Sequence, residues 1–268
     1  MKYVSSGSPP KFVSSVIISR KQWSKLFTEI VLVDSQLKPA WLNDFLSMKT
    51  KQLNQILDWL YKEKKICQNL RAIEVGLDLL VVNLDTFSEI ILKTIQYLKK
   101  GSIVDSDQIF FCLISGRVTL IFDEVEIKNQ LVSHLENILI QLKAKQSNNQ
   151  LDINIDAQNF TPTVFGIALG YPIVYVDLME STIPLTIDLS VWTFEISISK
   201  EIGKNTTSKH ENHLSVDYSF SFPTGAGAIA IQSDLLEKWK RGVVDACILN
   251  GFKYNFNISS KLNANVTL

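Results

Sequence analysis

Apolar residues recur along this chain with two spacings, one of three or four residues and one of two. The first spacing predicts amphipathic helices and the second predicts half-buried strands. Helices are predicted near residues 19–27, 39–61, 86–99, 124–144, 162–169 and 234–249. Strands are predicted at 30–33, 70–75, 77–84, 109–114, 118–122, 173–176, 185–198, 214–222 and 252–258. Because hairpins outnumber strand–helix–strand crossovers, we expect an α/β protein of the α+β type, with a mixed, largely antiparallel sheet flanked by helices.

Two stretches share one order of elements: a strand, a tight turn, a second strand and a helix. Gly76 and Gly116 lie at the two turns. This order suggests a duplicated hairpin-plus-helix unit, and we expect the two copies to lie side by side and extend one sheet. Farther along, the alternation over 185–198 reverses its phase, which predicts a bulge or bend near Val191 and Trp192.

The length of 268 residues allows one large domain or two small ones. Residues 1–12 contain Ser, Gly and Pro in a cluster and predict a disordered tail. Polar runs near 145–150 and 201–212 predict surface loops. The helices of the second half need strands from elsewhere to cover them, so we expect residues 13–268 to form a single α/β domain.

Charge and targeting signals limit which partners and which cellular compartments are expected. Lys plus Arg and Asp plus Glu are both 27, so no net field draws the chain to nucleic acid or to an anionic membrane. The N-terminus lacks the apolar core of a signal peptide. The uncharged stretch 157–176 is interrupted by Pro162, Pro172 and two glycines, and it therefore predicts a buried helix and a strand rather than a membrane span.

The three cysteines, Cys67, Cys112 and Cys247, have no metal-binding spacing, and we expect reduced thiols, with Cys112 buried in its apolar run. Together with the missing signal peptide, this predicts an intracellular, soluble protein, cytoplasmic or nuclear. No nucleic-acid partner and no membrane partner are expected.

The sharpest chemical pattern is a set of apolar runs that each end on aspartate, at Asp34, Asp85, Asp123 and Asp177. Carboxylates at the ends of strands on one sheet edge can share Mg²⁺ for hydrolysis or phosphoryl transfer. Asp85 and Asp123 also stand where helix caps stand. Asp34 and Asp177 are therefore the candidates for both a catalytic and a metal-binding role, and no cofactor other than Mg²⁺ is expected.

Weaker patterns have simple structural explanations. His210 and His213 have a metal-compatible spacing but no third ligand nearby, and His134 is expected at the surface of a helix. Gly225 and Gly227 stand between a strand and a helix, which makes them candidates for binding an anionic cofactor. They lack the third glycine and the lysine of known phosphate-binding loops.

Three segments carry a resemblance to a known family: Val33–Ala40 (VDSQLKPA), Leu169–Tyr175 (LGYPIVY) and Ser219–Pro223 (SFSFP) ahead of Trp239. They resemble an uncharacterised animal family whose human member carries only a chromosome 1 open-reading-frame name. The resemblance implies a eukaryotic single-domain protein, and it implies no activity, cofactor or catalytic residue.

The function most consistent with these patterns is a non-enzymatic interaction or scaffold protein with a protein partner. Histidine is scarce and no catalytic set is complete in the sequence. The alternative is the Mg²⁺-dependent hydrolase or phosphoryl-transfer enzyme that would use Asp34 and Asp177.

Overall fold

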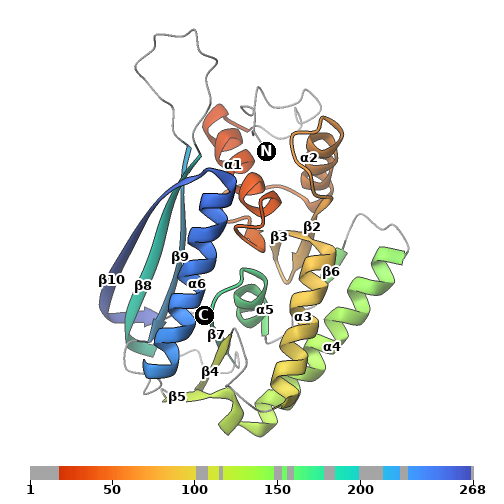
Figure 1. The fold of residues 1–268 in the computed structure, drawn as a ribbon. Coiled ribbons are helices and arrows are strands. Elements are labelled where there is room, and N and C mark those ends of the chain that lie inside the picture. Colours follow the sequence, from red (N-terminus) through yellow and green to blue (C-terminus); the bar gives the residue numbers. More distant parts are fainter. Residues whose placement is uncertain are drawn as a thin grey trace.

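The chain contains helices and strands in a mixed order, as the computed structural model shows (Figure 1). The residues that the structure describes are 18–100, 108–114, 117–147, 153–155, 160–177, 185–198, 214–223 and 229–266. Their α-helices are α1 Arg20–Asp34, α2 Thr50–Lys62, α3 Leu84–Lys100, α4 Val125–Ser147, α5 Thr161–Ala168 and α6 Ile229–Asn250. Their strands are β1 Ala40–Leu42, β2 Leu70–Val75, β3 Asp78–Asn83, β4 Ile109–Ile114, β5 Arg117–Leu120, β6 Ile153–Ile155, β7 Ile173–Asp177, β8 Leu185–Ile198, β9 Leu214–Pro223 and β10 Lys253–Val266.

The described strands form three sheets, with the orders β1-β3-β2-β6, β5-β4-β7 and β10-β8-β9. The pairs β2–β6 and β4–β7 are parallel, and the other pairs are antiparallel. The prediction of a mixed, largely antiparallel α/β fold is therefore confirmed, with the strands divided among three sheets.

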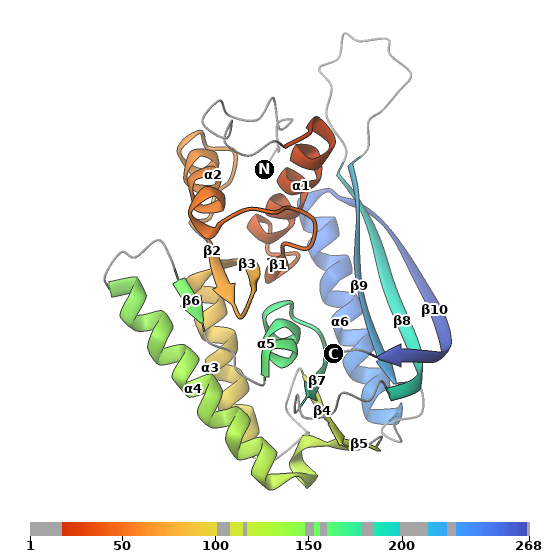
Figure 2. The same cartoon turned by 180° about the vertical axis from the view of Figure 1, so that it is seen from behind.

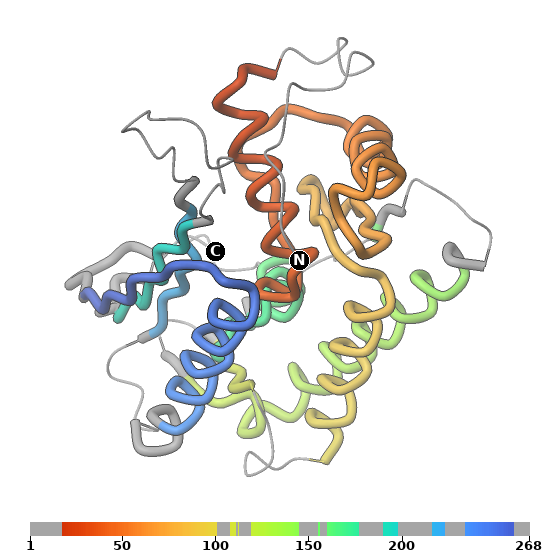
Figure 3. Tube along the Cα trace, turned by 45° about the horizontal axis from the view of Figure 1, so that its top comes forward, coloured from red at the N-terminus to blue at the C-terminus, as the bar shows by residue number. Residues whose placement is uncertain are grey.

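Helices cover these sheets in two groups. Figures 1 and 2 show α6 lying along one face of the β10-β8-β9 sheet, while α3 and α4 lie side by side on the other flank of the molecule with α5 between the two groups. In the tilted view of Figure 3, α1 runs between α2 and the part of the chain that contains α6. One apolar core joins α1 and α2 to β8, β9 and α6, and a second joins α3, α4 and α5 to the β1-β3-β2-β6 and β5-β4-β7 sheets.

The predicted strand at residues 30–33 is wrong, because these residues continue α1 to Asp34. Ser19 begins the helix as predicted: its hydroxyl accepts from Gln22 N, and Gln22 Oε1 accepts from Ser19 N. Every residue from Leu26 to Asp34 is buried. A helix buried on all sides carries apolar residues at consecutive positions, and such a run resembles a strand in sequence.

The helix predicted over 39–61 begins only at Thr50, because Ala40–Leu42 forms strand β1 against β3. Asn43 then turns the chain: its side-chain amide donates to Leu46 O, and its side-chain oxygen accepts from Leu46 N. Trp41 and Leu42 share the spacing of the helix only by coincidence.

Both hairpin-plus-helix units are present, although they do not extend one sheet as predicted. The hairpin β2–β3 precedes α3, and β4–β5 precedes α4, but the two hairpins belong to different sheets. In each unit the first hairpin strand has a later strand parallel to it on its other side, β6 for β2 and β7 for β4. The two units therefore share their pairing pattern as well as their order.

The C-terminal region differs from the expectation in its details. The bulge lies in β10, between Lys261 and Ala264, and not near Val191. Helix α6 begins at Ile229, earlier than predicted, and β10 continues to Val266. The stretch 157–176 contains α5 and β7, as expected, and no described helix is long and apolar enough to cross a membrane.

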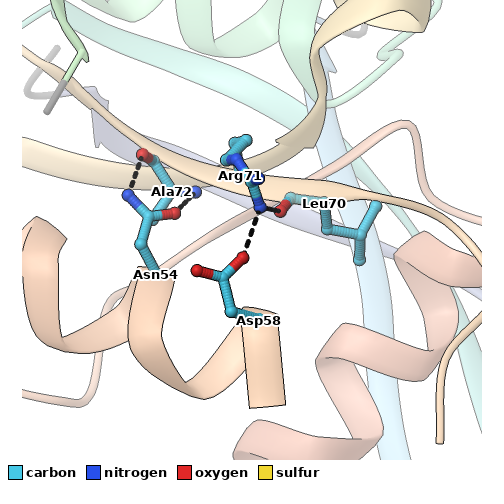
Figure 4. A network of polar contacts seen from close by, with 5 residues as sticks. All are labelled: Asn54, Asp58, Leu70, Arg71 and Ala72. Atoms are coloured by element: carbon cyan, nitrogen blue, oxygen red, sulfur yellow. Dashed lines mark hydrogen bonds and ion pairs between the residues drawn. The ribbon is translucent and has the colours of Figure 1, made fainter. Parts of the chain in front are cut away.

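Polar contacts attach α2 to the first sheet (Figure 4). Asn54 Nδ2 donates to Ala72 O at 3.1 Å, and Ala72 N donates to Asn54 Oδ1 at 2.8 Å. Strand β6 pairs with β2 only from Ile73 onward, so the Asn54 amide bonds the backbone just before that pairing begins. One turn later, Asp58 forms an ion pair with Arg71 at 2.9 Å.

Candidate functional site

Asp34 ends α1 and is 4% exposed. Its Oδ1 accepts from Cys67 N at 2.8 Å and from Gln68 N at 2.7 Å. The positive ends of two N–H dipoles thus already point at this carboxylate, an arrangement that suits a structural acceptor better than a cation ligand. The geometry at Asp34 therefore supports a structural role.

The contacts of Asp34 continue through two amide side chains. Gln68 Nε2 donates to Asp34 O at 2.7 Å, and Asn83 Nδ2 donates to Gln68 Oε1 at 3.0 Å. Asn83 Oδ1 in turn accepts from Asp85 N and Thr86 N at the start of α3. Asn83, and not Asp85, is thus the residue that caps α3, and this network connects the end of α1 with the start of α3.

The other predicted aspartates lie on other elements: Asp85 on α3, Asp123 in a short 3₁₀ turn and Asp177 on β7. Asp177 is the last residue of β7 and lies opposite Leu113 in the register, but its side chain is outside the described part of the chain. Asp123 is exposed and ends a short 3₁₀ turn ahead of α4. Among the described residues, no group of three His, Cys, Asp or Glu side chains could hold a metal ion. A metal-binding role for Asp177 stays a prediction.

The remaining predicted candidates divide between described and undescribed residues. Gly225, Gly227, His210 and His213 lie outside the described residues. His134 is buried on α4 with its ring 5.4 Å from that of Phe160, so the expectation of a surface position is wrong. Cys112 is buried as predicted, Cys247 is also buried, and Cys67 is exposed.

The three segments that carry the family resemblance meet at one place. Tyr218 on β9 donates its hydroxyl to Leu169 O at 2.8 Å, and its ring lies 5.2 Å from Lys38 Nζ. Tyr171 stacks on both Tyr218 and Phe220, at 6.4 and 5.8 Å between ring centroids. Segments distant in the sequence therefore form one junction between α1, the end of α5 and β9.

A buried ion pair lies at this junction. Lys38 Nζ is 2.9 Å from Glu29 Oε2, and the two side chains are 8% and 6% exposed. Gly170 brings the chain close to the same loop: its φ is +69°, and an added Cβ would lie 2.6 Å from Pro39 Cγ. The pair satisfies both charges inside the protein, and the close backbone approach leaves no space for a side chain at Gly170.

Burial dominates the titration of the aromatic hydroxyls here. Burial, together with the negative charges of Glu29 and Asp44, raises the pKa of Tyr171 to about 12. Burial also raises the pKa of Tyr175 and of Tyr218. These phenols stay protonated at neutral pH and can donate hydrogen bonds, but they cannot act as bases.

Four exposed apolar residues lie at the end of α6 and along β10. We name this surface, formed by Ile248, Leu249, Tyr254 and Ile258, the α6–β10 surface; these residues are 66%, 86%, 41% and 54% exposed. Gly251, with a φ of +68°, makes the turn between the two elements. The sequence holds a signal for this surface, because Trp239, Val243 and Cys247 repeat at helical spacing while Ile248 and Leu249 fall outside that repeat.

The chain matches the model of one protein family. Residues 13–249 match the model of a domain of unknown function, DUF4504, and β10 lies beyond the matched residues. No curated protein and no solved structure matches the chain. Because the match spans most of the sequence, the chain belongs to this family, which carries no assigned function.

Proposed function

We propose that this protein works as a non-enzymatic interaction module that binds a protein partner through the α6–β10 surface. The observation that carries the proposal is the concentration of exposed apolar side chains. Four of the nine large apolar residues that are exposed in the described structure fall within residues 248–258. Contiguous exposed apolar surface on a folded protein is typical of a protein–protein contact.

The aromatic packing next to this surface supports the same proposal. Aromatic residues of β8, α6 and β10 pack against one another next to it: the ring of Phe194 lies 5.5 Å from Trp239 and 4.6 Å from Phe256. A well-packed layer holds the exposed residues in place, so little side-chain and backbone entropy is lost when a partner binds. The surface is therefore an ordered platform.

The described candidates for chemistry support this function more than the alternative. Asp34 bonds the backbone of another loop, and the Glu29 and Lys38 charges neutralise each other. The Mg²⁺-dependent hydrolase that would use Asp34 and Asp177 stays the alternative.

Site-specific crosslinking in cells tests the proposal. A photoreactive phenylalanine at Leu249 is expected to capture one discrete protein. The matched control is the same group at Leu77, which is fully exposed on the β2–β3 turn and lies outside the α6–β10 surface. The adduct from position 249 should disappear when Ile258 is replaced by Asp.

Two results would contradict the proposal. Equal capture from positions 249 and 77 would show unspecific contact. The absence of any adduct from position 249, together with turnover of a phosphate ester by the purified protein, would favour the enzymatic alternative.

A further inference from the structure

We propose that the partner contributes an extended, acidic segment that adds as a new strand to the free edge of β10. This inference rests on the proposed function and specifies the chemical class of its partner.

Among the described strands, β10 offers an open backbone edge. The strand runs over Lys253–Val266 and pairs with β8 from Leu185 to Ser197. In the order β10-β8-β9 it is a terminal strand, and no described strand lies on its other side. In an antiparallel ladder, alternate residues direct their N–H and C=O groups away from the paired neighbour, so a second extended chain can bond them.

The side chains of β10 alternate between a face toward α6 and the opposite face. Tyr254, Phe256 and Ile258 stand opposite Ile196, Phe194 and Trp192 in the register, and these three residues of β8 are buried. Phe256 is covered by Lys240, whose Nζ lies 4.7 Å from its ring. Tyr254 and Ile258 remain exposed. An added strand with apolar residues at alternate positions would cover both of them.

The charge of β10 selects an acidic strand. Its sequence contains Lys253 and Lys261 and no Asp or Glu, and Lys253 is exposed. Side chains of an added strand would contact those of β10 directly, whereas Glu195 on β8 lies one strand farther away, by about 4.8 Å. Opposite charges paired across neighbouring strands stabilise a sheet and like charges destabilise it.

The same lysines disfavour a second copy of this chain as the partner. Antiparallel self-pairing centred on Asn257 would put Lys253 of one copy opposite Lys261 of the other. Lysines and bulges also protect sheet edges against unwanted pairing. The exposure of Tyr254 and Ile258 on the same strand distinguishes β10 from an edge that is only protected.

Peptide binding to the whole chain tests the inference. The probes are three labelled nine-residue peptides: one alternates Glu and Val, the second alternates Lys and Val, and the third is the acidic peptide with a central Pro. Fluorescence anisotropy should show binding of the acidic peptide, with the other two weaker by at least about ten-fold. Hydrogen exchange of the amides of β10 should slow when the acidic peptide is bound.

The charge-reversed double variant Lys253→Glu/Lys261→Glu is the decisive control, and circular dichroism confirms that it folds. It should prefer the lysine peptide. The inference is overturned if both charged peptides bind equally, or if the double variant shows no change in preference. It is also overturned if no peptide binds up to about 1 mM, because a millimolar affinity is the weakest that counts as recognition. Concentration-dependent dimerisation through β10 would instead identify a second copy as the occupant. Any of these results leaves the crosslinking at Leu249 intact, so failure of the inference and failure of the proposed function can be told apart.

Discussion

At the scale of one residue, Asp34 is a candidate metal ligand in the sequence, and its carboxylate accepts two backbone hydrogen bonds in the structure. Its two backbone donors lie 33 and 34 residues away along the chain. Local sequence carries no signal for contacts at that separation. The run of apolar residues ahead of Asp34 could be recognised, but the partner of its carboxylate could not.

Replacement of Asp34 tests this role. Asp34→Ala leaves two partly buried N–H groups without their acceptor, so we expect the free energy of unfolding to fall by about 1–3 kcal/mol. Asp34→Asn keeps an oxygen acceptor and should cost about half as much. Urea denaturation followed by circular dichroism measures both. Unchanged stability in Asp34→Ala would show that the carboxylate is not an anchor.

The raised pKa of Tyr171 predicts how the stability of the protein responds to alkaline pH. Its pKa in the folded protein, about 12, exceeds the ordinary value of 10.0, so the stability that its protonated form supports is complete below pH 10 and is lost as the pH rises toward 12. Burial also raises the pKa of the Cys112 thiol to about 12 and that of the Cys247 thiol to about 11, from an ordinary value of 9.0. Both thiols therefore lower the free energy of unfolding as the pH rises above 9.

We therefore expect the free energy of unfolding to decline above about pH 9. Tyr171→Phe should flatten the decline between about pH 10 and 12, by at most about 2.7 kcal/mol for a shift of two pKa units. Guanidinium denaturation at a series of pH values measures this. An identical decline in Tyr171→Phe and the unaltered protein would contradict the burial of this phenol.

At the scale of elements, both hairpins could be predicted from alternation and the turn at Gly76, because their contacts are local. The second half of α1 could not, because the complete burial of residues 26–34 removes the polar face on which helical periodicity depends. The short strand β1 was missed for a related reason: its pairing with β3 is a long-range contact. The α6–β10 surface could not be predicted as a whole, because it depends on the position of β10 relative to α6.

The two hydrogen bonds of Asn54 hold α2 against β2 and give a prediction for this pair of elements. Asn54 is buried, so Asn54→Ala should lower the free energy of unfolding by about 2–4 kcal/mol. Asp58→Asn, in the neighbouring and partly exposed ion pair, should cost less than about 1 kcal/mol. Thermal and urea denaturation of both variants provide the comparison. Equal losses would contradict the assignment of the amide as the main attachment.

At the scale of the whole molecule, residues from both ends of the chain share one core. Trp23 and Leu26 of α1 belong to the same apolar cluster as Phe194 of β8 and Val243 of α6. We propose on this basis that residues 13–268 unfold as a single unit. Circular dichroism and tryptophan fluorescence should give one coincident transition, with equal calorimetric and van't Hoff enthalpies. Two separated transitions would instead indicate two domains.

The measurement that tests the central proposal most directly is the affinity of the partner captured at Leu249 for three forms of the whole chain. These are the unaltered protein, the double variant Leu249→Ser/Ile258→Thr and the matched control Leu77→Ser. All three replacements remove exposed apolar side chains, so the fold should be retained in each form. An interaction module predicts that the double variant binds at least about ten-fold more weakly while Leu77→Ser binds normally. Equal affinities of the three forms would contradict a partner-binding role for the α6–β10 surface.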